Sequence, residues 1–476
     1  MPATMPRRVI LYELNEVPWE IVDLYTDERP SSVLAGLMSR SHCLTTRNDD
    51  PVGLQPWRTW PTFHKSLYVD DHQSFDLGQD PETFVGDNLW DVVDRTGRGV
   101  GLFGPLQSWP PRPFTAGGFF VPDTFSPDPA TEPPALERFQ AFNLAMTRRN
   151  GFSSATNLDR AEMLTAGLDL LARGLTPWSA QRLSAHVLRE RIDHRYKACR
   201  PMMQVLPCFD LYRRLDRRHR PDLSVFFTNH VAAMMHRYWG DGVPAYAGDH
   251  EYEVDPVFRG FVVGAMDLFD RQLGRLVRDV DRSPGSVLIV ASSMGQGPID
   301  HREIAETYVL EDAERLTGAL GLGEGAVGLA MYPCTSLRFA SSEAAKKAAE
   351  VVGSVTSAAG PMFGEVRAMG TTVSFEIAYQ FSGSSLPTSV RWSPPASEEV
   401  IEAGIDDLGI AIRRRLGGGN TAYHIREGLM MAYGDGVPPD GSRREVSVLD
   451  AAPSILRLLD LEPAPSMRGA DTMFSA

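Results

Sequence analysis

The chain has 476 residues, of which 43% are hydrophobic and 23% charged, as expected of a globular protein large enough for more than one domain. Its formal net charge of −14 leaves no basic surplus to neutralise phosphates, so nucleic acid is excluded as the main partner. No run of ~18 uninterrupted apolar residues occurs, and therefore neither a membrane span nor a membrane partner is expected.

In chain order, four continuous apolar runs predict buried strands, each followed by a helical pattern. They are residues 8–14 (RVILYEL), 99–104 (GVGLFG), 223–229 (LSVFFTN) and 286–292 (SVLIVAS). Continuous Val, Ile, Leu and Phe are typical of a parallel sheet buried on both faces. Helical patterns such as 87–95 and 256–279 alternate with the strands, which predicts right-handed crossovers. The expected fold class is α/β, with a central, mostly parallel sheet flanked by helices.

Three stretches of different character interrupt this pattern. Residues 109–134 are rich in Pro and Gly and are expected to form an ordered but irregular loop. Residues 135–220 contain many arginines and predict a helical insertion, and residues 311–400 carry alternating strand signals that predict a small α/β cap. Residues 1–134, 221–310 and 401–476 then form the α/β core domain.

The four cysteines have no CxxC spacing, which favours reduced thiols in a cytoplasmic protein over a disulfide scaffold. The first apolar run, VILY, is too short for the core of a signal peptide and is better interpreted as a strand. A cytoplasmic location is therefore expected. The sequence does not indicate an oligomeric state.

Polar side chains follow the strands at the points where they end. Glu13, Asn15 and Glu16 lie at the end of the first strand, and Asn229 and His230 follow the third. The fourth opens into the stretch SSMGQ at residues 292–296, and a late stretch places His424 just before another apolar strand. Because the carboxyl ends of parallel strands meet in one crevice, functional side chains are expected to gather there.

Six segments, in this order, carry a family resemblance together that none would carry alone. They are Thr59-Trp60-Pro61, Asn88-Leu89-Trp90 with Gly97 and Gly99-Val100, His236-Arg237-Tyr238-Trp239, Ser292-Ser293-Met294-Gly295, His424 with Glu427-Gly428, and residues 448–469 (VLDAAPSILRLLDLEPAPSMRG). The chain thereby resembles the alkaline phosphatase superfamily, in particular its type I phosphodiesterase/nucleotide pyrophosphatase branch. The resemblance covers nearly the whole chain and implies an alkaline-phosphatase-like sheet with inserted caps.

Enzymes of this branch use two zinc ions, which clamp the attacking and leaving oxygens of an in-line displacement. The resemblance places His236 and His424 at two ligand positions of one ion, with Ala232 where the third ligand, an acid, would stand. The ligand positions of the other ion are occupied by Asn15, Thr59, Ser293 and Met294. Neutral oxygens and a thioether bind zinc poorly, so a two-zinc site is not expected.

One divalent ion, with zinc as the expected metal, is the cofactor that these residues could still hold. The expected ligands are His236, His424 and His230, with an acid such as Glu13 or Glu16 completing the set. In the alternative without metal, His230 caps a helix and Glu13 pairs with an arginine. The sequence leaves both alternatives open.

The resemblance also assigns the remaining catalytic roles. Thr59 is expected to be the nucleophile, although the spacing to His72 makes Thr62 an alternative, and Asn15 is expected to hydrogen-bond the anionic group. His64 or His72 would have to act as the base, because a threonine hydroxyl needs one. In the structural alternative, Thr59 caps a helix.

Arg58, Lys65 and Trp60 are expected to line a pocket for a small-molecule anionic ester, although tryptophans more often lie in the core. The leading hypothesis is an enzyme that hydrolyses or transfers the group of a phosphate or sulfate ester, with His236 and His424 holding a metal or acting as acid and base. The alternatives are a binding protein without hydrolytic chemistry and a metal-independent transferase.

Overall fold

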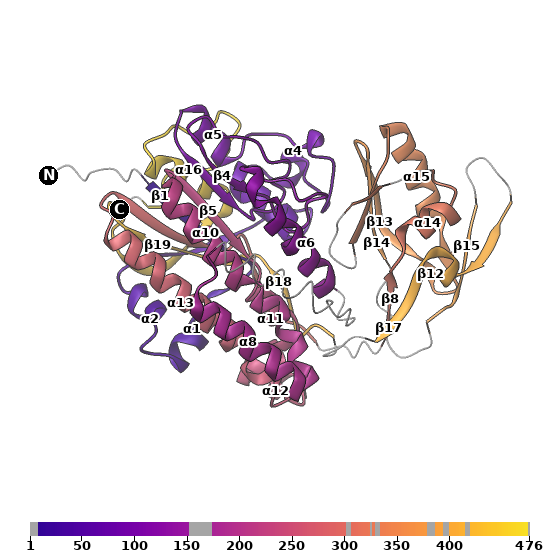
Figure 1. The fold of residues 1–476 in the computed structure, drawn as a ribbon, viewed down its shortest axis with the longest axis horizontal. Coiled ribbons are helices and arrows are strands. Elements are labelled where there is room, and N and C mark those ends of the chain that lie inside the picture. Colours follow the sequence, from indigo (N-terminus) through magenta and orange to yellow (C-terminus); the bar gives the residue numbers. More distant parts are fainter. Residues whose placement is uncertain are drawn as a thin grey trace.

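The computed structural model describes residues 8–151, 174–300, 306–323, 326–328, 334–377, 386–393, 399–414 and 419–474. An eight-stranded sheet in the order β20-β2-β19-β6-β1-β5-β3-β4 lies at its centre (Figure 1). The strands are β1 (Arg8–Leu14), β2 (His42–Arg47), β3 (Val100–Phe103), β4 (Gly118–Val121), β5 (Leu223–Thr228), β6 (Ser286–Ala291), β19 (Glu427–Gly434) and β20 (Asp440–Ser447).

The four apolar runs of the sequence form β1, β3, β5 and β6. β1 pairs in parallel with β5 and β6, and β3 pairs in parallel with β5 and β4. β2 and β20 are also parallel, whereas β19 runs antiparallel to both β2 and β6. The predicted α/β class with a mostly parallel central sheet is therefore confirmed. The prediction of an irregular loop over residues 109–134 was wrong at β4, where Phe119, Phe120 and Val121 are buried beside β3.

Helices cover both faces of the sheet, because the strands alternate their side chains between two cores. On β1, Ile10 and Tyr12 pack in one hydrophobic cluster, and Val9 and Leu11 pack in the other. The first cluster includes side chains of α1 (Trp19–Glu28), α2 (Val33–Met38), α10 (Val205–His219), α11 (Ala232–Gly242) and α13 (Phe261–Asp281), and the second those of α3 (Pro56–Lys65), α5 (Leu89–Arg95) and α16 (Ala451–Leu458).

The predicted helical insertion lies partly within the described residues. It contains α6 (Glu137–Gly151), α8 (Pro177–Ile192), α9 (Arg200–Met203) and α10, while residues 152–173 lie outside the described part. Phe209 and Tyr212 of α10 pack under the sheet against Phe226 of β5. This insertion is thereby joined to the first hydrophobic cluster of the core.

A second unit, drawn in orange in Figure 1, has its own hydrophobic cluster, to which Leu337, Val352 and Phe375 belong. Its elements are β8 (Glu306–Leu310), α14 (Ala313–Ala319), β9 (Ala326–Gly328), β10 (Cys334–Arg338), α15 (Ser342–Ser354), β11 (Thr356–Ser357), β12 (Gly360–Pro361), β13 (Phe363–Met369), β14 (Thr372–Ile377), β15 (Ser389–Trp392), β16 (Ile401–Gly404) and β17 (Ile410–Arg414). β8 pairs antiparallel with β17, so the chain enters and leaves this unit through adjacent strands.

Polar contacts join this second unit to the core. Arg58 Nη2 lies 3.0 Å from Glu365 Oε2, and Arg367 Nη1 lies 2.7 Å from Asp76 Oδ1. All four cysteines of the chain are free. Within the described ranges, no helix combines the length and the apolar character that a membrane crossing requires.

Candidate metal centre

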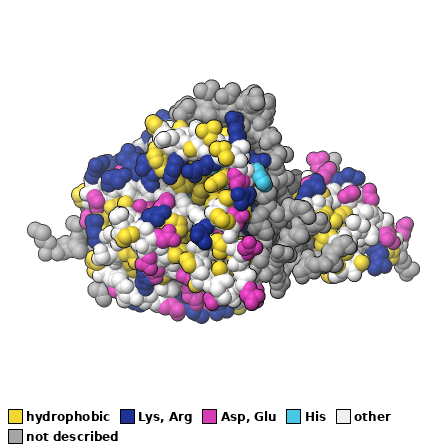
Figure 2. Space-filling view, turned by 90° about the horizontal axis from the view of Figure 1, so that it is seen from below, with side chains coloured by type: hydrophobic (Ala, Val, Ile, Leu, Met, Phe, Trp, Pro, Cys, Tyr) yellow, Lys and Arg dark blue, Asp and Glu magenta, His cyan; other side chains and the backbone are white. Residues whose placement is uncertain are grey.

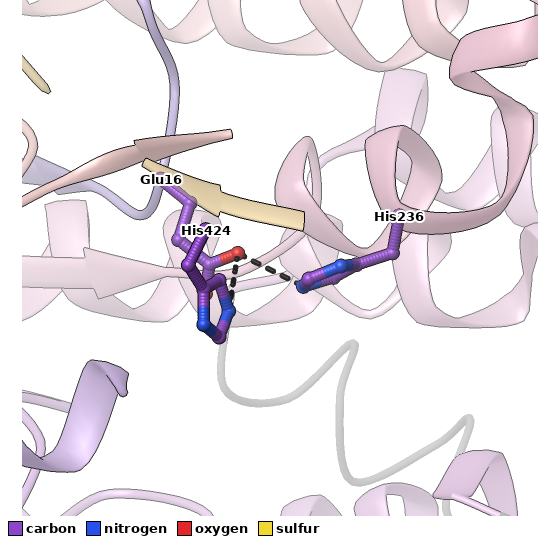
Figure 3. A group of neighbouring side chains, drawn as sticks. All are labelled: Glu16, His236 and His424. Carbon is purple, nitrogen blue, oxygen red and sulfur yellow. Dashed lines mark ion pairs between the residues drawn. The ribbon is translucent and has the colours of Figure 1, made fainter. Parts of the chain in front are cut away.

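Three side chains from distant segments meet at the carboxyl edge of the sheet (Figure 3). Glu16 follows β1, His236 lies on α11, and His424 lies on the short strand β18 (Ala422–Ile425). Glu16 Oε2 is 2.9 Å from His236 Nε2 and 3.4 Å from His424 Nε2. One ligand atom of each residue lies within 4.8 Å of the others, close enough for one ion to contact all three.

The backbone after β1 turns the Glu16 side chain into this group. Glu16 has φ 61, in the left-handed region that residues other than glycine seldom adopt. Such a conformation costs of order 1 kcal/mol or more and persists where the surroundings hold it, as they do in functional sites. The strand register is kept up to the turn, because Asn15 N donates to Thr228 O of β5.

His424 is placed by a two-stranded ribbon. β18 pairs antiparallel with β7 (Gly295–Pro298), and His424 lies opposite Gln296 in that register. A Cβ on Gly295 would come within 2.1 Å of the Glu427 carbonyl oxygen, so only glycine permits this close approach. The stretch SSMGQ therefore continues into β7, which pairs with the strand that carries His424.

Both imidazoles are oriented by backbone carbonyls. His236 Nδ1 lies 3.2 Å from Ala422 O, and His424 Nδ1 lies 2.8 Å from Leu54 O. A carbonyl can only accept, so each Nδ1 carries hydrogen, and in the neutral ring each Nε2 then presents a lone pair to Glu16. Two lone pairs facing one carboxylate oxygen call for a proton or a cation between them. The same carbonyl anchoring is typical of histidines that bind metals.

The Glu16 carboxylate is held by its own hydrogen bonds. Asn15 Nδ2 donates to Oε1 over 2.6 Å, and Gln296 Nε2 donates to Oε2. Trp60 Nε1 in turn donates to Asn15 Oδ1 over 2.7 Å. The indole can only donate, which fixes the orientation of the Asn15 amide and leaves its nitrogen facing Glu16.

Glu16 is ionised in this setting. Burial by itself would raise the pKa of the carboxyl, which is only 2% exposed, but positive charge on His424 and His236 would hold that pKa well below its usual range, and a cation bound among the three groups would act in the same direction. A buried carboxylate and two oriented imidazoles are a donor set that zinc takes, and three protein ligands leave a coordination position open. The residues present therefore fit one divalent ion.

His230, the third expected metal ligand, lies outside this group. Its Nδ1 is 2.8 Å from Thr228 Oγ1, and burial lowers the pKa of His230 to about 3, so the ring is neutral. The structure thus brings His236 and His424 together, with Glu16 as the acid. His230 lines the same cavity but is not one of the three grouped ligands, and Glu13 Oε1 is 2.6 Å from His64 Nε2 in the core.

The expected nucleophiles lie deeper than the metal group. Thr59 is 1% exposed, and its Oγ1 is 2.8 Å from Ser293 Oγ. Thr62 Oγ1 is 3.1 Å from His72 Nε2, and burial lowers the pKa of His72 to about 3. Neither threonine belongs to the wall of the cavity described below. Met294 is fully buried.

The three expected substrate-binding residues use their polar atoms within the protein. Arg58 donates to Phe75 O over 2.7 Å and contacts Glu365. Lys65 Nζ donates to the carbonyls of Val85 and Gly86, and burial lowers the pKa of Lys65 to about 8. Trp60 is fully buried and donates to Asn15. None of the three lines the cavity.

A cavity of about 610 Å³ opens over the metal group. Glu16, His236 and His424 form one part of its wall. Apolar side chains from the strand ends and the helical insertion form another, including Phe103, Phe226 and Val205, and the second unit closes it with residues such as Glu314 and Glu376. This size and partly apolar lining are typical of small-molecule sites.

Two residues with contacts at this site carried no signal that singled them out in the sequence. Gln296 has no titratable group, and only the pairing of β7 with β18 brings it to Glu16. Arg237 lines the cavity beside His236 but belonged to a motif that was matched for its histidine.

No family model and no curated protein matches the chain. Among solved structures, an inactive variant of murine ectonucleotide pyrophosphatase/phosphodiesterase 5 in complex with AMP is 11% identical with a TM-score of 0.41, over 98% of this chain and 97% of that one. A second structure of the murine protein is 10% identical with a TM-score of 0.41, over 98% of this chain and 98% of that one. The human protein is also 10% identical with a TM-score of 0.41, over 98% of this chain and 100% of that one. These proteins are nucleotide pyrophosphatase/phosphodiesterases, the branch that the sequence motifs resemble.

Proposed function

We propose that the protein is a metal-dependent enzyme that hydrolyses or transfers the group of a phosphate or sulfate ester, using one divalent ion held by Glu16, His236 and His424. One observation carries the proposal: two imidazoles with carbonyl-anchored Nδ1 atoms direct their Nε2 atoms at one ionised carboxylate oxygen. This geometry supports a cation ligand set more directly than a hydrogen-bonding role, because no hydrogen of a neutral imidazole lies between the three atoms.

A zinc ion at such a site supplies a Lewis acid for an ester oxygen and lowers the pKa of a water molecule. The protein's own residues then have defined tasks. Asn15 and Gln296 keep the Glu16 carboxylate in place, and the carbonyls of Ala422 and Leu54 orient the two imidazoles. The cavity wall of core, helical insertion and second unit encloses the ester and limits the access of bulk water.

The geometry favours water over Thr59 as the attacking group. Thr59 Oγ1 is buried against Ser293 Oγ, and its side chain is absent from the cavity wall. Neither Ser293 nor Thr59 offers the other a base, since both are neutral hydroxyls. The role of Thr59 as nucleophile stays a prediction, and Thr59→Ala tests it. If water attacks the ester, the variant should retain turnover, and no covalent intermediate should be detected in either protein.

Metal content and an ester panel test the proposed function. Protein purified without chelator should hold about one zinc or manganese ion, and Glu16→Gln should hold none. Turnover of p-nitrophenyl phosphate, bis(p-nitrophenyl) phosphate and p-nitrophenyl sulfate is measured with each metal and after metal removal. Glu20→Gln is the control, because Glu20 lies one turn away on α1 and is exposed.

A second candidate is a binding protein of the same fold. The observation behind it is that Asn15, Ser293 and Met294 stand at positions where the resemblance implies metal ligands and use their side chains for internal contacts. A protein that holds one metal ion, but leaves every ester in the panel at background with any metal, would favour this candidate. Turnover of a donor and acceptor pair by metal-free protein would instead favour a transferase.

A further inference from the structure

The charges in the cavity wall are unevenly distributed. Arg237 is its single Lys or Arg among the described residues, whereas the same wall contains the carboxyl groups of Glu16, Glu311, Asp312, Glu314 and Glu376. Glu311 is neutralised in part by Arg413, 2.7 Å away. On the outer face in Figure 2, by contrast, side chains of both signs are interspersed. The cavity therefore offers one site for an anion within otherwise acidic surroundings.

Arg237 is placed beside the metal group by the local backbone. It follows His236 on α11, and the helix is interrupted directly afterwards at Tyr238, which has φ −118 and ψ 16. Burial raises the pKa of Tyr238, and the charge of the neighbouring Arg237 opposes that rise. Across the described ranges, no carboxylate lies within ion-pair distance of the Arg237 guanidinium. A half-buried guanidinium without an acidic partner is well suited to a phosphate or sulfate oxygen pair, which it can bind in a bidentate way.

Asn229 offers a second donor on the same wall. Trp60 can only donate to Asn15 Oδ1, so Asn15 Nδ2 must be the atom that lies 2.7 Å from Asn229 Oδ1. The oxygen of the Asn229 amide is therefore used, and its nitrogen is the end left for a ligand. Asn229 lines the cavity together with Arg237, Glu16, His236 and His424.

We propose that Arg237 and Asn229 bind the anionic group of the substrate, and that the acidic remainder of the wall selects esters with a single anionic group and an uncharged or cationic remainder. Phosphate and sulfate monoesters of neutral alcohols satisfy this description, and nucleoside polyphosphates do not. The catalytic part of this inference rests on the proposed function, but the binding of an anion by Arg237 does not.

Binding of inorganic phosphate to the metal-free protein tests the anion site without any turnover. Arg237→Gln should weaken it ~10–100-fold, as expected for the loss of charge-assisted hydrogen bonds. Arg237→Lys should give an intermediate affinity, because a single ammonium replaces the planar fork. Arg282→Gln is the matched control, since Arg282 is exposed at the end of α13. Equal phosphate affinity in Arg237→Gln and wild type, or no phosphate binding by wild type, would overturn the inference.

Selectivity is tested with tripolyphosphate as the second probe. Wild-type protein should bind tripolyphosphate no more tightly than phosphate despite its larger charge, and Glu314→Gln with Glu376→Gln should raise the tripolyphosphate affinity severalfold while leaving the phosphate affinity unchanged. Tighter binding of tripolyphosphate by wild type would contradict the proposed selectivity.

Failure of this inference is distinguishable from failure of the proposed function. If Glu16→Gln abolishes metal binding and turnover but Arg237→Gln turns over the panel like wild type, the result supports the metal-dependent enzyme and contradicts the anion site at Arg237. If no ester is turned over with any metal, but phosphate binding still depends on Arg237, the anion site stands alone. Metal content of Arg237→Gln must equal that of wild type, which shows that His236 next to it is undisturbed.

Discussion

Replacing Glu16 by Gln should abolish tight metal binding and leave the fold intact. Gln retains the size of the side chain and an acceptor oxygen, but it lacks the charge that faces His236 Nε2 at 2.9 Å and His424 Nε2 at 3.4 Å. At a free metal concentration about 100 times the dissociation constant, binding stabilises the wild type by ~2.7 kcal/mol. For a chain of 476 residues this corresponds to a rise of roughly 3 °C in Tm. The variant should show almost none of this rise.

Thermal unfolding with and without chelator provides the assay, together with metal analysis after dialysis. In chelator the variant should unfold near the wild-type temperature, because a Gln amide can donate to one imidazole nitrogen and keeps an oxygen for Asn15. Glu20→Gln should behave as wild type in both conditions. A Glu16→Gln protein that keeps one ion and the full metal-induced rise in Tm would refute the assignment of Glu16 as a ligand.

Three further predictions follow from the same contacts. Gln296→Ala removes a bond to the Glu16 carboxylate and should weaken metal binding ~10–100-fold, measured by competition with a chelator. In metal-free protein, Glu16 has a folded pKa well below its ordinary value of 4.5, so its contribution to the free energy of unfolding is fully present above that value and is lost as pH falls through the lower folded pKa. The free energies of unfolding of wild type and Glu16→Gln in urea should therefore differ just above that value and converge as the pH falls through the lower folded pKa; a difference that grows as the pH falls would contradict this. Arg58→Ala removes one of the two donors to the Phe75 carbonyl, with Trp57 Nε1 left as the other, and also the hydrogen bond to Val52 O and the ion pair with Glu365. It should destabilise the protein by about 1–3 kcal/mol in urea unfolding, with phosphate affinity unchanged, in contrast to Arg237→Gln.

The central strands were predictable because burial on both faces leaves a continuous apolar run. β1 and β6 are buried along nearly their whole length, and their sequences show it. β20 lies at the edge of the sheet and buries only Val446 fully, so its sequence DGSRREVS carries no strand signal. β4 is short and lies within a stretch rich in Pro and Gly, and its pairing with β3 outweighs that local composition.

The two histidines of the metal group were predictable from their place in the motifs, whereas the sequence left the acid open between candidates such as Glu13 and Glu16. Consecutive residues of a strand point to opposite faces, so continuing β1 regularly would send Asn15 and Glu16 in different directions. The left-handed conformation of Glu16 breaks this alternation and brings its carboxylate into the site. Such a backbone reversal has no signature in the residue type, since Glu is not a residue that favours it.

Under the proposed function, Arg237 supplies positive charge that a second metal ion would otherwise supply. The positions at which the resemblance implies the ligands of that second ion carry neutral side chains. Asn15 is hydrogen-bonded to Trp60, Thr59 is hydrogen-bonded to Ser293, and Met294 is fully buried. A divalent ion among these neutral side chains would meet no compensating negative charge. In-line displacement at an ester builds negative charge on the transferred group and on the leaving oxygen, and a single ion can neutralise only part of it. Arg237 is the remaining positive group on the described cavity wall. Arg237→Gln should therefore lower kcat as well as anion affinity, whereas a residue that only attracts the substrate would raise KM and leave kcat unchanged.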